Sequence, residues 1–177
     1  MQARGPLMIE HRLIERMLAL VKKSLEQIEA TKQVDSSFID TVVDFIRMYA
    51  DRTHHGKEED ILFAELADKK MSDYDLKVMN ELVEEHAMAR KTTQELVDAN
   101  SQYRAGKKSA LGVIAAKLKV LADFYPQHID KEDRVFFPAT RKYFSDHEDL
   151  LILKAFWDFD RKMIHEKYRS VVQNMGG

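Results

Sequence analysis

Apolar side chains recur along most of the chain at alternating steps of three and four residues, the spacing of an amphipathic helix. The first run extends from about Pro6 to Thr31. Steps of this kind form a heptad seam, along which one helix packs against its neighbours. The expected inward positions of this first helix are Leu7, His11, Ile14, Leu18, Val21, Leu25 and Ile28.

Three further runs of the same period follow. We expect helices from Asp35 to about Asp68, from Ser72 to about Arg104 and from about Ser109 to Tyr143, and capping residues start the first two. Their expected inward positions are Ile39, Val43, Ile46, Ala50, His54, Glu58 and Ile61; Leu76, Met79, Val83, His86, Arg90, Thr93 and Val97; and Ile114, Leu118, Leu121, Tyr125, His128, Glu132 and Val135.

A fifth helical run begins at Ser145, where Glu148 completes a capping-box pattern, and extends to about Asn174. It either covers the open end of a bundle or forms a dimer interface, and covering within one chain is the simpler expectation. Its large apolar residues are Leu150, Leu151, Leu153, Phe156, Trp157, Phe159, Ile164 and Val171.

Short loops between the runs require that sequential helices pack antiparallel. The expected fold is therefore all-α, a single domain of residues 1–177. An up-down-up-down four-helix bundle occupies about residues 7–143, and an additional helix occupies about residues 145–174.

Composition agrees with a helical protein and narrows its chemistry. Only 6 Gly and 3 Pro occur in 177 residues, and the net charge of −2 gives no electrostatic reason to expect nucleic acid or membrane as a partner. No apolar run approaches the ~20 residues of a membrane span. The first residues lack the apolar stretch of a signal peptide, so we expect a cytoplasmic location. Absence of cysteine excludes disulfides, thiolate metal sites and thiol nucleophiles.

Six polar residues fall on the expected inward stripes and form a candidate metal site. Glu58 and Glu132 follow His54 and His128 by four residues, so each pair shares one helix face. Any one inward histidine is more simply a hydrogen-bonded core residue. Two carboxylates facing a core without a cation, however, would each cost several kcal/mol of desolvation. The first four helices each contribute one histidine: His11, His54, His86 and His128.

An internal repeat indicates two metal ions. Residues 54–64 align without gaps to residues 128–138, and His, Lys and Glu coincide. This predicts a pseudo-two-fold bundle with two similar half-sites. The register selects His54 as the ligand, so we expect His55 outside the set of direct ligands. A role for His55 beside the ligands, or as an extra ligand, stays open. Imidazole with carboxylate suits iron, manganese or zinc better than magnesium or calcium.

The motifs resemble the hemerythrin-like family, the HHE cation-binding domains, over roughly residues 7–143. This resemblance implies a non-haem centre of two iron ions that reacts with dioxygen, peroxide or nitric oxide, with manganese or zinc as less favoured metals. The matching pieces are Ile9-Glu10-His11-Arg12, His54-x-x-Lys57-Glu58-Glu59 with Ile61-Leu62-Phe63, Glu84-Glu85-His86, and His128-x-x-x-Glu132 with Val135-Phe136-Phe137-Pro138.

The chain departs from the family's oxygen carriers at two positions. Carriers look to have a further histidine four residues after the one in the third helix, where this chain has Arg90. They also use an aspartate five residues after the histidine of the fourth helix. Asp133 has that spacing, but Glu132 lies better on the inward stripe. With one histidine fewer, the site resembles the family's bacterial stress-response and sensor members more than its carriers.

Several nearby residues have two readings. Tyr125, one turn before His128, is either a hydrogen-bonding or ligating phenol at the coordination gap or a core aromatic with a satisfied hydroxyl. Glu59 and Asp133 are expected around the ligands or in solvent. His147 and His165 are expected at the surface.

Three functions remain open from the sequence. The first is binding or sensing of dioxygen or nitric oxide in oxidative or nitrosative stress. The second is a redox enzyme that reduces peroxide, dioxygen or nitric oxide with electrons from a donor protein. The third is iron handling. A coordination position left open by the missing histidine would favour reactivity over stable carriage. We rank binding or sensing first, with the redox enzyme close behind it.

Overall fold

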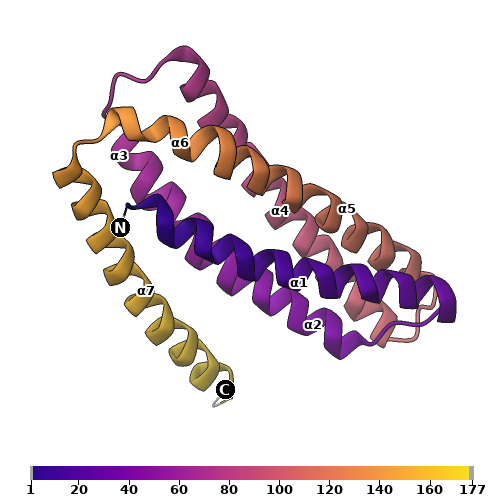
Figure 1. Ribbon diagram of the computed structural model, residues 1–177. Helices are drawn as coiled ribbons and strands as arrows, with labels where there is room; N and C mark the ends of the chain where they lie inside the picture. The colour runs from indigo at the N-terminus through magenta and orange to yellow at the C-terminus, as the bar shows by residue number, and fades with distance from the viewer. Residues whose placement is uncertain (1, 176–177) are drawn as a thin grey trace.

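The computed structural model describes residues 2–175, and it leaves out the side chains of residues 164, 166 and 168–175. Four long helical rods run in alternating directions, and a fifth helix follows them (Figure 1). The second rod, residues 36–67, and the fourth rod, residues 110–143, change helix type along their length. The elements are α1 (Arg4–Thr31); α2 (Ser36–Phe45), η1 (Ile46–His55), η2 (Glu58–Phe63) and α3 (Ala64–Ala67); α4 (Asp73–Arg104); α5 (Ala110–Lys131), η3 (Glu132–Phe136), α6 (Phe137–Thr140) and η4 (Arg141–Tyr143); and α7 (Asp146–Met175).

Capping side chains start three of these helices where the sequence placed them. The Asp35 carboxylate accepts from the Ser37 N–H at 2.8 Å, and the Ser72 hydroxyl accepts from the Asp75 N–H at 3.2 Å. At α7, Ser145 and Glu148 form the reciprocal capping box. The expected all-α bundle with an added helix is thus confirmed. Within the described residues, no helix combines the length and apolar content that a bilayer crossing requires.

Two apolar clusters flank a polar layer in the bundle. The larger cluster lies among α1, α2, α4 and α5 and includes Leu18, Ile39, Leu96 and Leu118. The smaller one joins the other end of the bundle to α7 and includes Leu7, Leu62, Phe63, Leu82, Phe136, Phe137 and Phe156. The polar histidines and glutamates lie between these clusters, so packing fixes the helices on both sides of them.

Three π-helical segments shift the inward face of the second and fourth rods. We expected Ile61 and Val135 to point inward, but Ile61 is only partly buried and Val135 is 38% exposed. Their neighbours Leu62 and Phe136 are buried instead. A π-helical turn bonds residue i to i+5, so it moves the buried stripe by one residue relative to an α-helical pattern.

The buried stripe of α4 also differs from the expected one. Leu76, Val83 and Arg90 were expected inward but are exposed. The buried positions Leu82, Ala89 and Leu96 have the same seven-residue spacing. Periodicity alone does not distinguish these two neighbouring stripes, and α4 packs against both α2 and α5, which selects one. Arg90 therefore keeps its charge at the bundle rim.

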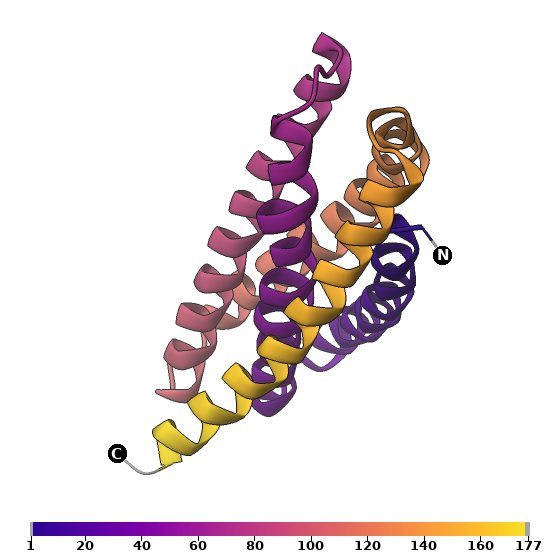
Figure 2. The same cartoon turned by 90° about the vertical axis from the view of Figure 1, so that its left-hand side faces the viewer.

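Helix α7 crosses the second rod, as Figure 2 shows. Leu153 and Phe156 are buried, whereas Leu150, Leu151 and Trp157 are exposed. The helix thus covers the bundle as expected, but only some of its apolar residues are buried there. The side chains of Ile164 and Val171 lie outside the described ones. The close approach of α7 to the second rod depends on Gly56. A Cβ there would lie 2.8 Å from Phe159 Cζ.

Asp75 ties the start of α4 to the end of the fourth rod and should make stability acid-sensitive. Hydrogen bonds from Lys142, Tyr143 and Ser72 lower the pKa of this buried carboxyl to about 2. Its stabilisation is complete above the unfolded pKa of about 3.9 and is lost as pH falls towards 2. We expect Asp75→Asn to lower the free energy of unfolding by about 1–3 kcal/mol at neutral pH, measured by urea denaturation.

Below a pH of about 2, where Asp75 is protonated in the folded and the unfolded protein, the Asp75→Asn variant and the wild type should become equally stable. Asp73→Asn, in the same helical turn but exposed, is the control and should change little. An undiminished difference at low pH would contradict the assignment.

Candidate metal centre

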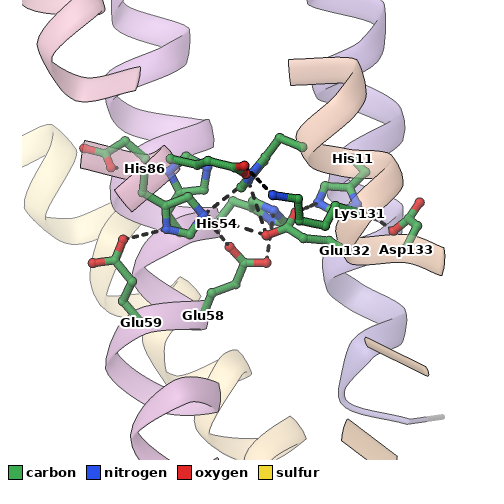
Figure 3. Close-up of polar contacts among 12 residues, drawn as sticks. His11, His54, Glu58, Glu59, His86, Lys131, Glu132 and Asp133 are labelled. Carbon is green, nitrogen blue, oxygen red and sulfur yellow. Dashed lines mark hydrogen bonds and ion pairs between the residues drawn. The ribbon is translucent and has the colours of Figure 1, made fainter. Parts of the chain in front are cut away.

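Seven buried side chains gather in the polar layer, in two groups. Within each group one ligand atom per residue lies within 4.8 Å of the others. Figure 3 shows the carboxylates of Glu58 and Glu132 lying between the imidazole rings. The first group is His11, His54, Glu58 and Glu132, and the second is His55, His86 and His128.

All four rods of the bundle contribute to this centre. His11 comes from α1 and His86 from α4, while η1, η2 and the α5–η3 junction supply the remainder. The three π-helical segments thus coincide with the polar layer. Such segments are rare in proteins as a whole. Those that occur are often found at functional sites, because a wider turn redirects side chains. The structure brings together all six residues expected as ligands, and it adds a seventh.

The seventh residue is His55, which the structure groups with His86 and His128. Its ring is 1% exposed and stacks on His86, with ring centroids 3.8 Å apart. The repeat favoured His54 because residue 129, the counterpart of His55, is isoleucine. Ile129 is itself buried at 3% exposure. An apolar residue at the matching position was therefore the available signal that position 55 also faces inward.

Each of the two glutamates spans both groups with its two oxygens. Such an arrangement suits carboxylates that bridge a pair of cations. The contacts are Glu58 Oε1 to His54 Nε2 at 3.6 Å and Oε2 to His86 Nε2 at 3.5 Å; and Glu132 Oε2 to His11 Nε2 at 3.1 Å and Oε1 to His128 Nε2 at 3.3 Å.

An outer layer of carboxylates orients four of the five rings. Because a carboxylate only accepts, each neutral ring carries its proton on Nδ1 and directs the Nε2 lone pair towards the centre. In Figure 3, Glu59 and Asp133 lie on the outer side of His86 and His11. The pairs are His11 with Asp133 at 2.8 Å, His54 with Glu10 at 2.9 Å, His86 with Glu59 at 2.7 Å and His128 with Glu85 at 2.7 Å.

An arginine or lysine side chain forms an ion pair with every outer carboxylate. Each such chain of cation, carboxylate and imidazole ring leads towards the centre, and we call the four chains relays. Arg90, expected on the inward stripe, belongs to this outermost layer and also pairs with Asp51 at 2.7 Å. Glu59 and Asp133 thus hydrogen-bond the rings of His86 and His11 and are not free in solvent. The four pairs are Arg12 with Asp133, Lys57 with Glu10, Arg90 with Glu59 and Lys131 with Glu85.

One relay continues outside the four-helix bundle. Lys57 is fully buried and also contacts Asp160 of α7 at 2.8 Å. The chain from Asp160 through Lys57 and Glu10 to His54 therefore couples the position of α7 to one ring of the centre.

Unpaired polar atoms at the centre fit bound cations. Both oxygens of Glu58 and Glu132 and Nε2 of His11, His54 and His55 are buried without a hydrogen-bond partner among the described residues. Burial of so many unpaired acceptors is costly. Burial and the nearby charge of Glu132 also raise the pKa of Glu58 well above its ordinary value. Metal cations between the rings would remove both costs.

Two facing nitrogens give a second indication of a cation. Nε2 of His86 and Nε2 of His128 are 3.2 Å apart. Both rings donate their Nδ1 proton to a carboxylate, so two lone pairs face each other when the rings are neutral. A shared cation turns this repulsive contact into a favourable one.

Tyr125 is fully buried, but its hydroxyl has no hydrogen-bond partner among the described residues. The structure therefore does not support the reading of a core aromatic with a satisfied hydroxyl. Burial, followed by the charge of Asp51, raises the pKa of Tyr125, so the phenol remains protonated. His147 and His165 are exposed, as expected.

Comparison with known proteins supports a cation-binding centre. The family model of the hemerythrin HHE cation binding domain matches residues 6–140. The chain is similar to an uncharacterized protein of Mycobacterium bovis, with 24% identity over 171 residues that make up 96% of this chain and 66% of the relative. Uncharacterized proteins from two strains of Mycobacterium tuberculosis match to the same extent. The chain thus spans about two thirds of these relatives, and no solved structure matches it.

The placement of His55 yields a prediction on metal content. We expect His55→Ala to lose about half of the bound metal, because the second group falls from three imidazoles to two. Elemental analysis of purified protein measures this loss, with exposed His147→Ala as the control. Full metal content in His55→Ala would return that residue to a packing role.

The outer layer yields a second prediction. Glu85→Gln weakens the hydrogen bond that holds the ring of His128, and we expect metal affinity to fall by about 10- to 100-fold. Competition with a chromophoric chelator measures the change. Its control is Glu84→Gln, the exposed neighbour, which should bind as the wild type does. Equal affinities of the two variants would show that the relay does not support the site.

Proposed function

The chain belongs to the hemerythrin HHE cation-binding family, and on this premise we propose that it holds two iron ions and binds dioxygen or nitric oxide in a response to oxidative or nitrosative stress. One ion lies with His11 and His54, and the other with His55, His86 and His128. Glu58 and Glu132 connect the two. A cytoplasmic location is part of the proposal.

The observation that carries the proposal is the pair of buried carboxylates whose oxygens each face a different histidine group. Such a donor set, without thiolate, suits iron, manganese or zinc. We propose iron because a pair of redox-active ions can share electrons with a diatomic ligand. The protein's own residues exclude water around the centre and keep the Nδ1 protons on the outer carboxylates.

His55 changes the balance between binding and catalysis. The case for an open coordination position was based on Arg90 standing where carriers have another histidine. His55 supplies an imidazole to the same group as His86 and His128. This supports reversible binding as the leading function.

A redox enzyme is the second candidate, and one observation favours it. A pocket lined by His55 and Tyr125 adjoins the centre and offers a place for an exchangeable small substrate. In that case peroxide, dioxygen or nitric oxide is reduced with electrons from a donor protein. Iron handling gains less support, because two arginines and one aspartate line the same pocket, which is therefore not an acidic channel.

The prediction concerns protein reduced without oxygen and then mixed with dioxygen or nitric oxide. We expect the visible spectrum to change with both gases and to return when the gas is removed. The control is protein stripped of metal. Reversal supports binding, and steady consumption of peroxide with an added reductant supports the enzyme. Fast loss of iron to a chelator supports iron handling. No spectral change with either gas would contradict the proposal.

A further inference from the structure

One pocket reaches the centre from the side of the bundle. Its volume is about 250 Å³, and it lies between η1, α4 and α5. Unlike the tight apolar clusters, it joins exposed side chains at its mouth to buried ones at its floor. The lining residues that matter here are Arg47, Asp51, His55, Arg90, Gln94 and Tyr125. We call it the Tyr125 pocket.

The floor of the Tyr125 pocket holds unused hydrogen-bonding groups. His55 and Tyr125 are each 1% exposed, and their rings stack at 6.4 Å between centroids. Neither the Tyr125 hydroxyl nor either ring nitrogen of His55 has a hydrogen-bond partner among the described residues. Asp51 Oδ1 is 3.5 Å from His55 Nδ1, too far for a good hydrogen bond. Burial of a phenol without a partner costs free energy unless another group accepts a hydrogen bond from its hydroxyl.

The mouth of the pocket carries charged side chains of both signs. Arg47, Arg90 and Asp51 line it, and Glu59 pairs with Arg90 beside it. Arg47 donates to Gln94 Oε1 at 2.6 Å, and Arg90 donates to Asp51 at 2.7 Å. These bonds hold the side chains at the rim. The two guanidinium groups offer hydrogen-bond donors to small anions and polar neutral molecules.

Mouth and floor together define a ligand class. The ligand accepts a hydrogen bond from a neutral phenol, passes between two arginines and is small enough to reach a ring of the centre. Small anions and peroxide-sized molecules of two or three heavy atoms meet these conditions.

We propose that the Tyr125 pocket is the route by which such ligands reach the His55 side of the centre, and that the Tyr125 hydroxyl donates a hydrogen bond to them. This inference rests on the proposed di-iron function. It goes beyond that function by assigning the access side, the ligand class and a ligand-binding residue.

The role of the Tyr125 hydroxyl can also be tested without a ligand. Tyr125→Phe removes a buried donor that has no partner, so the metal-free variant should melt no lower than the metal-free wild type. If the Tyr125 hydroxyl stabilised the fold, the metal-free variant would melt at a lower temperature than the wild type. A clear fall in melting temperature would mean that the hydroxyl has a structural partner, which would overturn its assignment to a ligand.

Azide is the probe for binding, because it is a small linear anion whose binding to iron is followed by visible absorbance. In oxidised protein with its full metal content, Tyr125→Phe should raise the azide Kd by about five- to tenfold, the loss of one hydrogen bond. Gln94→Trp at the mouth should slow azide association several-fold and leave metal content unchanged.

Met48→Trp is the matched control. Met48 lines a different pocket, beside Glu10 and Asp160, so the added bulk should not affect azide. Unchanged azide affinity in Tyr125→Phe, or slowing by Met48→Trp and not by Gln94→Trp, would overturn the proposal and leave the di-iron function standing. A wild type that purifies without iron would overturn both.

Discussion

The buried pair of carboxylates, Glu58 and Glu132, is the constraint on which the rest of the structure depends. Two ionised carboxylates cannot share a dry core unless positive charge compensates them. Five imidazoles surround them, and hydrogen bonds to Asp133 and Glu132 outweigh burial and raise the pKa of His11 to about 10. A proton on His11 offsets one carboxylate, whereas two bound cations offset both and also satisfy the unpaired ring nitrogens. The centre therefore makes sense as a holder of cations. The apolar clusters on both sides keep the layer in place.

The four relays around the centre also balance buried charge. Every outer carboxylate fixes the proton of one ring and is itself neutralised by an arginine or lysine, so charge alternates from the centre to the surface. His55 has no such relay and instead borders a pocket. The relay through Lys57 reaches α7, which gives the fifth helix a direct link to the centre.

Much of this was predictable, because helix periodicity and capping residues are local signals. They gave the five helices and the six polar residues that the structure gathers. Prediction failed where one extra residue matters. The π-helical segments moved the inward face from Val135 to Phe136 and left His55 beside His86, and no local pattern marks a π-helical turn. Arg90 was misplaced because two neighbouring stripes of α4 have equal spacing, and only packing chooses between them. The relays pair residues far apart in sequence.

The central claim is that two iron ions lie between two histidine groups joined by Glu58 and Glu132. Anomalous X-ray diffraction at the iron edge, from crystals of protein purified in air, tests it most directly. The account predicts two iron peaks in each chain, one beside His11 and His54 and the other beside His55, His86 and His128. A single peak, no peak, or a second iron without His55 next to it would contradict the account.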